Sequence, residues 1–487
     1  MLNNQQDIKE FILNAEKRFP VNNWKLNGFH IWPFLRKELF FYLKRQCGDS
    51  SKPKIHVLAW KTSGFKVKLV RSRALVLLFL RLLAENTTLF LRGITYKGWL
   101  NLFPKKDYLF VGHKNHRTRF ENKFFNRYFD SFIDIHGLEN DYLFYEFGKE
   151  LKGDRHKEEH IIGKELGYKL FRFRFYFKEL FLNKYRSKVS LIGYDGFLSF
   201  LSQDKVTKGF AINYSIPFLK SFMADWNCQE HFFNDVLRAI QPKNVFTLYY
   251  YNAEVMALLA ASNKLDIYTA DFQHGSIGDS HLAYSDWDIA PKEGYWMLPK
   301  SFWVWDKHTN ETINKWACKS LFHNTIVKGN PWIDYINLKN IDMEVEDGFI
   351  LYALQPSKNY EDVFFNKKIV DTIRNNNYRW YIRLHPTSLK DKEEIATILS
   401  ENKILKKVEI IKANQLPLPL LLKSAKAVVT FSSGCATEAA LMNKKTIVLS
   451  EKGSIYFSGL IAERMAYYVP YDDIDFEERF TALIESL

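Results

Sequence analysis

Two hydroxyls and a glycine interrupt the apolar run of residues 428–440, which reads Val-Val-Thr-Phe-Ser-Ser-Gly-Cys-Ala-Thr-Glu-Ala-Ala. The β-branched residues before Ser432 and the helix formers after Gly434 predict a strand that turns directly into a helix. The first turn of a helix has unpaired N–H groups and a partial positive charge, so this turn suits a phosphate. Glu438, about one helical turn further on, could reach the hydroxyls of a ribose. The alternative is an ordinary turn in which a serine caps the helix.

A histidine–proline pair follows another predicted strand, at residues 379–384. Pro386 disfavours helical geometry at His385, so the strand ends there and the imidazole lies at its carboxyl end. Ligands of open α/β sheets bind outside the carboxyl ends of the strands. We therefore expect His385, with Arg383 just before it, to share one rim with the turn at Ser432 and Ser433. A histidine that merely belongs to a turn is the alternative.

The pairing of His-Pro with a later Ser-Ser turn resembles the donor site of bacterial GT-B glycosyltransferases that make capsules and lipopolysaccharides. By motif it is similar to the sialyltransferase, Kdo-transferase and CDP-glycerol-transferase groups, which use cytidine-activated donors. The resemblance spans roughly residues 245–450. It implies that His385, Ser432 and Ser433 contact the donor phosphate. We place the neighbouring Arg383, Pro386 and Gly434 in the same donor site.

The start of the following helix carries a second resemblance. Thr437-Glu438-Ala439-Ala440 is similar to the helix start of UDP-sugar GT-B enzymes, in which the glutamate binds ribose. This implies the same role for Glu438. Negative charge growing on the leaving phosphate would then be stabilised by side chains and the helix dipole, without a metal ion.

Three residues compete as the catalytic base. His274 ends the predicted strand 266–272 in a Gln-His-Gly turn, and its ordinary pKa lies near working pH. The turn resembles the Trp-His-Gly turn of CDP-glycerol transferases but lacks the tryptophan. Glu254 opens a helix after another strand end, where simple dipole stabilisation is the alternative. Asp195, in Tyr-Asp-Gly, resembles the acidic motif of bacterial sialyltransferases but has only one acid.

No metal site or cofactor is predicted. Asp286 and Asp288 match an Asp-x-Asp metal motif, but the expected fold gives that motif no role and we interpret the match as accidental. The four cysteines are far apart, without the spacing of a zinc site, which indicates reduced thiols in a cytosolic protein.

Composition favours a folded protein with an anionic partner. The 487 residues are 16% aromatic and 25% charged, and the net charge is +14. A nucleotide sugar, phospholipid headgroups or nucleic acid would each fit this charge. Because the basic residues are dispersed and no nucleic-acid-binding module is evident, we exclude nucleic acid.

The N-terminus has no secretory leader, which favours a cytoplasmic location. An apolar run at 74–80 is too short to span a bilayer, which takes about 20 residues. Its basic flanks suit the inner face of the cytoplasmic membrane, and a helix packed on the domain is the alternative. The flanking cations are Lys66, Lys68, Arg71, Arg73, Arg81 and Arg92.

Alternating strand and helix patterns predict the βαβ units of a doubly wound α/β protein. The resemblance implies a GT-B fold, with two Rossmann-like domains facing across a cleft, here with an N-terminal helical extension. Strands of the first sheet are expected at 107–113, 142–147, 189–194, 245–250, 266–272 and 302–305. The expected parts are a basic helical region at 1–105, an acceptor domain at 106–340 with a helical insertion near 150–188, a donor domain at 341–472 and a terminal helix at 473–487 that returns toward the first domain.

The function predicted from these motifs is glycosyl transfer. The donor would be a nucleotide sugar, with CMP-linked Kdo or sialic acid favoured, and the acceptor a glycan or lipid-linked glycan of a surface polysaccharide. A non-hydrolysing nucleotide-sugar epimerase, or a CDP-polyol or UDP-sugar transferase of the same fold, is the alternative.

Overall fold

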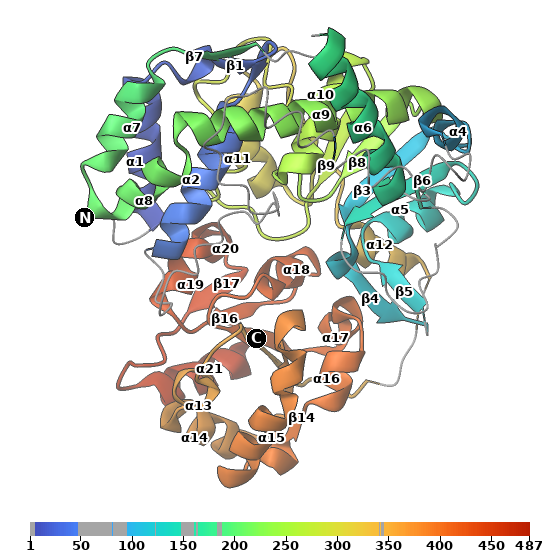
Figure 1. Cartoon of the computed structure of the whole chain (residues 1–487). Helices are drawn as coiled ribbons and strands as arrows, with labels where there is room; N and C mark the ends of the chain where they lie inside the picture. Colours follow the sequence, from blue (N-terminus) through green and yellow to red (C-terminus); the bar gives the residue numbers. More distant parts are fainter. Residues whose placement is uncertain are drawn as a thin grey trace.

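Two six-stranded sheets, each wholly parallel, form the body of the protein (Figure 1). The computed structural model describes residues 5–46, 80, 95–121, 123–147, 160–161, 164–182, 188–339, 341 and 345–487. The strand orders and the parallel register are those of two doubly wound, Rossmann-like domains, which confirms the predicted GT-B type of fold.

The first sheet has the order β11-β10-β9-β8-β3-β6. Its strands alternate large apolar side chains between two faces, so both faces are buried under helices. The face with Leu109, Val111 and Val245 packs on α9, α10 and α11, and the face with Phe110 and Phe246 packs on α5. The bounds are β3 Tyr108–His113, β6 Tyr142–Phe147, β8 Asn244–Thr247, β9 Tyr268–Phe272, β10 Ser301–Val304, β11 Asn324–Val327, α5 Phe129–His136, α9 Ile216–Ile240, α10 Ala253–Lys264, α11 Lys307–Ala317 and α12 Pro331–Leu338.

The second sheet has the order β14-β13-β12-β15-β16-β17. One of its faces packs on α14, α15 and α21, and the other on α16, α17 and α18. The bounds are β12 Ile350–Ala353, β13 Trp380–Arg383, β14 Val408–Glu409, β15 Ala427–Thr430, β16 Thr446–Val448, β17 Ala466–Tyr468, α13 Tyr360–Phe364, α14 Lys367–Asn375, η3 Pro386–Asp391, α15 Lys392–Glu401, η4 Leu405–Lys407, α16 Ile411–Gln415, α17 Leu418–Ser424, α18 Cys435–Leu441, α19 Glu451–Tyr456, α20 Ser458–Ala462 and α21 Phe476–Ser486.

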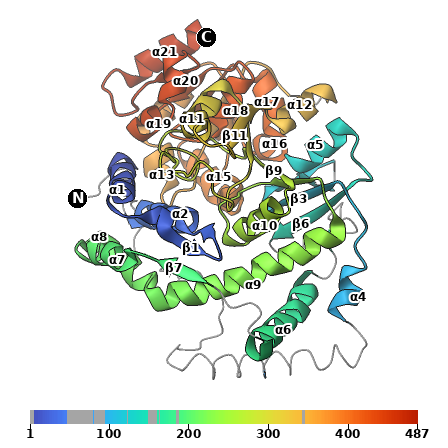
Figure 2. The ribbon, with the colours of Figure 1, turned by 90° about the horizontal axis from the view of Figure 1, so that it is seen from above.

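Smaller elements flank the first domain. In Figure 2, α9 runs along the molecule, with the N-terminal elements toward one end and α4 and α6 toward the other. The buried Arg36 of α2 pairs with Glu16 of α1 (2.7 Å) and ties the N-terminal region to this domain by donating to the carbonyl of Asp286 (2.8 Å). The bounds are α1 Gln5–Arg18, η1 Val21–Asn23, β1 Trp24–Leu26, β2 Phe29–His30, α2 Trp32–Gln46, α4 Tyr96–Leu100, η2 Lys114–His116, β4 Arg117–Phe120, β5 Lys123–Asn126, α6 Lys164–Leu182, β7 Val189–Leu191, α7 Tyr194–Ser202 and α8 Lys205–Asn213.

Two elements, the strand expected at 189–194 and the terminal helix, lie elsewhere than predicted. The strand expected at 189–194 ends at Leu191 as β7, which pairs antiparallel with β1 in a separate three-stranded sheet. Gly193, with φ 76°, turns the chain there and Tyr194 begins α7. The terminal helix does not return toward the first domain. Phe480 of α21 stacks on Trp380 at 5.8 Å, inside the core of the second domain.

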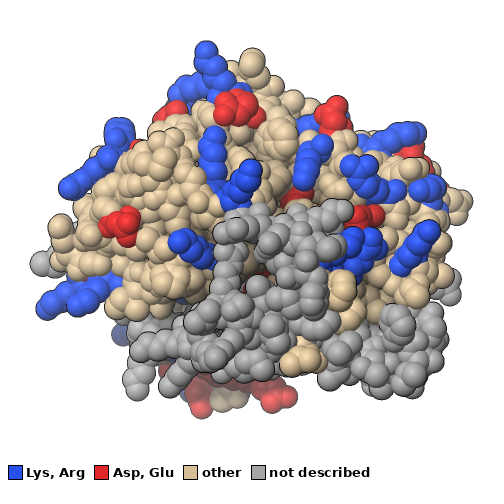
Figure 3. All heavy atoms as spheres, turned by 45° about the horizontal axis from the view of Figure 1, so that its top comes forward, with Lys and Arg blue, Asp and Glu red and all other residues tan. Residues whose placement is uncertain are grey.

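Residues 74–79 of the predicted membrane-surface segment, and the cations that flank it, lie outside the described residues. None of the described helices combines the length and the apolarity that crossing a bilayer requires. On the face shown in Figure 3, lysine and arginine side chains are spread over the described surface with acidic side chains among them.

Candidate functional site

The strand order places a crevice at the carboxyl edge of the first sheet. The chain runs from β3 to β6 on one side and later to β8 on the other, so the order reverses between β3 and β8. Open α/β sheets bind ligands at such a reversal. The residues that follow these strands and the neighbouring β9 include His116, Tyr249, Tyr251 and His274.

A buried carboxylate shapes the turn after β8. Asp271 accepts hydrogen bonds from the Thr247 hydroxyl (2.7 Å), the Tyr250 N–H (3.1 Å) and the Tyr284 hydroxyl (2.9 Å). Burial raises the pKa of Asp271 to about 7. The turn it holds includes Tyr249 with φ 70°, a left-handed geometry that is costly for a bulky residue.

Three uncharged imidazoles gather at this edge. The rings of His116 and His274 are 5.5 Å apart, and Tyr251 lies 6.3 Å from His274 and 5.8 Å from His281. Burial lowers the pKa of His274 to about 4, that of His281 to about 3 and that of His116 to about 2. Each Nδ1 atom is buried without a hydrogen-bond partner in the described part of the chain. A neutral imidazole with an unpaired nitrogen can accept a hydrogen bond from a ligand, but the lowered pKa makes each of these rings a weaker base than the ordinary histidine expected from the sequence.

The turn that carries His274 is fixed from three sides. The Tyr128 hydroxyl donates to the His274 carbonyl (2.8 Å), and the Gln273 amide donates to the Gly275 carbonyl (3.0 Å). The backbone N–H of Trp305 donates in turn to the Gln273 side-chain oxygen (2.7 Å). The predicted base candidate is therefore rigidly placed at the end of β9.

The Ser-Ser turn lies at the matching reversal of the second sheet, between β12 and β15. Part of its donor capacity is used internally, because the Ser433 N–H donates to the Thr430 hydroxyl (3.0 Å) and the Cys435 N–H to the Ser433 hydroxyl (3.4 Å). The amide of Gln355 also lies against the turn, 2.9 Å from the Ser432 nitrogen. Gly434 is exposed beside it. The side-chain hydroxyls, more than the backbone, are the groups that a ligand would meet.

The predicted donor-site residues Arg383 and His385 have different surroundings. Arg383 donates to the carbonyls of Ala413 (2.7 Å) and Leu416 (2.9 Å), so it anchors the end of α16. His385 is exposed and caps η3, with its Nδ1 2.7 Å from the Thr387 hydroxyl. Pro386 is the first residue of η3. Burial, and then Arg127, lower the pKa of His385.

An arginine that the motifs do not reveal faces the donor side from the first domain. Arg127 interacts electrostatically with Glu438, Cys435 and His385 of the second domain. Burial raises the pKa of the Glu438 carboxyl, and Arg127 and then Arg383 oppose that rise. The Arg127 guanidinium lies 5.2 Å from the Tyr128 ring centre and donates no hydrogen bond within the described residues.

Direct contacts also join the two domains at this place. The hydroxyl oxygens of Ser276 and Thr437 are 2.6 Å apart, and the Tyr456 hydroxyl donates to the Ser276 carbonyl (3.0 Å). The turn after His274 therefore touches both α18 and α19. The predicted base and the predicted ribose-binding helix are brought to one place.

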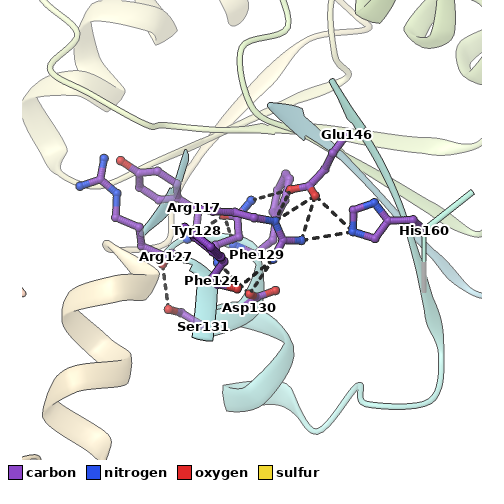
Figure 4. Close-up of polar contacts among 10 residues, drawn as sticks. Arg117, Phe124, Arg127, Tyr128, Phe129, Asp130, Ser131, Glu146 and His160 are labelled. Carbon is purple, nitrogen blue, oxygen red and sulfur yellow. Dashed lines mark hydrogen bonds and ion pairs between the residues drawn. The ribbon is translucent and has the colours of Figure 1, made fainter. Parts of the chain in front are cut away.

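A buried ionic network supports the loop that carries Arg127 (Figure 4). Arg117 pairs with Glu146 (2.8 Å) and lies 3.6 Å from Asp130, and all three side chains are fully buried. Asp130 accepts from the Asn126 N–H (2.7 Å). The Asn126 side chain in turn accepts from the N–H groups that open α5, those of Tyr128 (3.2 Å) and Phe129 (3.1 Å). Figure 4 shows the Arg127 guanidinium directed away from this network.

The other two base candidates lie elsewhere. Glu254 accepts a hydrogen bond from the Tyr145 hydroxyl and is near Lys164, on the α6 side of the sheet, and burial raises its pKa. Asp195 is exposed in the first turn of α7, beside the N-terminal elements.

The Asp-x-Asp acids do not converge either. Asp286 pairs with Lys9 (2.8 Å) and Asp288 with Lys319 (2.6 Å). Among the described residues there is no cluster of three metal-ligating side chains.

Comparisons with known proteins give structural likeness only. No protein-family model and no curated protein sequence matches the chain. The UDP-GlcNAc 2-epimerase from Methanocaldococcus jannaschii is 15% identical, with a TM-score of 0.43 over 78% of this chain and 91% of that chain. The UDP-GlcNAc 2-epimerase from Neisseria meningitidis bound to UDP-GlcNAc is 14% identical, with a TM-score of 0.42 over 78% and 91%. Arabidopsis thaliana UGT89C1 complexed with UDP-L-rhamnose is 11% identical, with a TM-score of 0.36 over 78% and 90%.

Proposed function

We propose that this protein is an enzyme that binds a nucleotide-activated sugar where its two domains meet. The observation that carries the proposal is the guanidinium of Arg127. It interacts electrostatically with Glu438 and Cys435 of the opposite domain and donates no hydrogen bond within the described chain. A half-buried guanidinium of this kind suits a phosphate oxygen, to which it can donate two parallel hydrogen bonds.

The remaining donor contacts follow from their positions. The hydroxyls of Ser432 and Ser433 would donate to phosphate oxygens, and the free nitrogen of His385 would approach from the rim. Glu438 would accept hydrogen bonds from the ribose hydroxyls, with Arg127 opposing the rise that burial gives to the pKa of its carboxyl group. Arg383 holds α16 through its Nη1 atom, which donates to the carbonyls of Ala413 and Leu416, and its positive charge would favour the bound phosphate.

The finer proposal is transfer of the glycosyl group to a hydroxyl acceptor. The neutral imidazole of His274 takes the proton of that hydroxyl, the acceptor oxygen attacks the anomeric carbon, and the nucleotide leaves with the bonding electrons. Arg127 stabilises the negative charge that grows on the departing phosphate. The acceptor would be a glycan or lipid-linked glycan of a surface polysaccharide, and CMP-linked donors remain the favoured class.

A second candidate is epimerisation of the same kind of nucleotide sugar. The observation that favours it is the His116–His274 pair, two neutral imidazoles 5.5 Å apart. For this reaction the pair would have to carry one extra proton between them, so that the neutral imidazole removes a proton from one face of the sugar and the protonated imidazole returns a proton to the other face. On the other hand, Glu438 is the one carboxylate among the described residues placed opposite Arg127, whereas we expect an epimerase to surround the sugar with several acids.

A turnover panel separates the two reactions. Purified protein is incubated with CMP-, UDP- and GDP-sugars, with and without a mixture of oligosaccharide acceptors, and the products are followed by NMR and chromatography. Transfer releases nucleotide only when an acceptor is present. Epimerisation yields a new nucleotide sugar without release. Absence of both reactions, with no nucleotide bound, would refute the proposed function.

A further inference from the structure

A pocket opens at the carboxyl ends of β9, β10 and β11, next to the site described above. Its volume is about 430 Å³, which falls within the usual range of small-molecule sites, roughly 300–1,000 Å³. Gln273, which directly precedes His274, is part of its wall. The pocket therefore lies on the first-domain side of the predicted base, where an acceptor would have to lie.

The lining is mainly aromatic. Phe132, Phe272, Trp303 and Trp305 contribute to it, and Trp303 is stacked on Phe272 with 4.9 Å between ring centres. The N–H of the buried Trp305 indole has no acceptor among the described residues. This nitrogen has almost no exposed surface, so a ligand in the pocket would contact the Trp305 ring and not its N–H.

A basic and an acidic side chain lie at the rim of the pocket. Lys328 is exposed, with its ammonium 5.0 Å from the Trp303 ring centre, and Asp334 is exposed on α12. Burial raises the pKa of the Asp334 carboxyl. The rim thus offers one cation, one carboxyl group and the exposed imidazole of His136, which suits a neutral ligand rich in hydroxyls.

We propose that this pocket binds a neutral saccharide unit of the acceptor. The C–H groups on one face of a pyranose ring are apolar and pack against aromatic faces, while its hydroxyls can donate to Asp334 and accept from Lys328. A simple alkyl chain would fill the aromatic part but would make no hydrogen bond to Asp334 or Lys328. The assignment of this saccharide as acceptor rests on the proposed function.

The test measures saccharide and nucleotide binding separately. Maltose, cellobiose, lactose and diacetylchitobiose are screened at millimolar concentration by saturation-transfer NMR and tryptophan fluorescence, with decyl phosphate as the alkyl probe. We expect at least one disaccharide to bind. Trp303→Phe and Asp334→Asn should each weaken it about tenfold, while Trp296→Phe and Glu139→Gln, at exposed positions outside the pocket lining, leave it unchanged.

The outcomes are distinguishable. Nucleotide affinity unchanged in both pocket variants, with saccharide binding lost, supports the inference. If no saccharide binds, if the pocket variants bind it normally, or if decyl phosphate alone binds, the inference is overturned and the proposed function stands. If the saccharide binds in the pocket but no nucleotide binds to the protein, the proposed function falls, and with it the acceptor role.

Discussion

The neutrality of His274 has a consequence that can be measured without knowing the substrate. Burial lowers the pKa of His274 to about 4, against an ordinary value of 6.5. At pH 5.5 an unperturbed imidazole would be about 90% protonated, whereas one with this pKa would be about 3% protonated. The ring should therefore keep its unprotonated chemical shift down to about pH 5.

The same shift links stability to pH. Because the folded-state pKa is below the unfolded one, the contribution of His274 is fully present above pH 6.5 and is lost as pH falls toward 4. Between pH 8 and pH 5.5 the loss from this one residue is about 1.4 kcal/mol. Other buried groups titrate in this range, so the informative quantity is the difference between variants.

The assay is urea unfolding of wild type and His274→Gln at both pH values. The fall in the free energy of unfolding should be smaller in the variant by about 1.4 kcal/mol. His323→Gln is a positive control, because burial lowers the pKa of His323 to about 4 as well and it lies away from the site. A His274 resonance that titrates near 6.5, or a variant with the full wild-type pH dependence, would refute the reasoning.

Three further predictions concern single side chains. His274→Ala should keep nucleotide affinity but lose turnover by roughly 10²–10⁴-fold. Glu254→Gln and Asp195→Asn should stay near wild type, because neither residue lies where the two domains meet. Steady-state kinetics of the three variants tests this prediction. Arg117→Met should lower the free energy of unfolding by about 3–5 kcal/mol, because Glu146 and Asp130 would be left without their buried cation. Arg119→Met on the same hairpin should change it by less than about 0.5 kcal/mol. Urea unfolding measures both values. His385→Ala and Ser433→Ala should each weaken nucleotide binding by about 1.5–3 kcal/mol without altering circular dichroism, and unchanged affinity in both would place the phosphate elsewhere.

Much of the fold is legible in local patterns. Runs such as Tyr108–His113 and Ile350–Ala353 are short, apolar and bounded by turn residues, so their strand character does not depend on distant contacts. The partners of a short strand are less local. β7 has a similar pattern, yet Gly193 ends it early and it pairs with β1, which no periodicity reveals.

Local sequence patterns likewise predict only part of the candidate site. His274 and the Ser432–Ser433 turn could be predicted, because a strand end followed by a polar turn defines its own position. Arg127 could not, since it follows a hairpin without a motif and reaches the second domain only through the packing of α5 and the Arg117 network. Glu254 has the same helix-start signal as a functional carboxylate, but its Tyr145 partner is far away in the sequence.

The central claim, a nucleotide phosphate held at Arg127, is tested most directly by calorimetric titration. CMP, CDP, UDP and GDP are titrated into wild type, Arg127→Met and the exposed control Arg119→Met. We predict saturable binding of at least one nucleotide, about 10- to 150-fold weaker in Arg127→Met and unchanged in Arg119→Met, with a cytidine nucleotide tightest. Equal affinity in all three proteins, or no binding to the wild type, would contradict it.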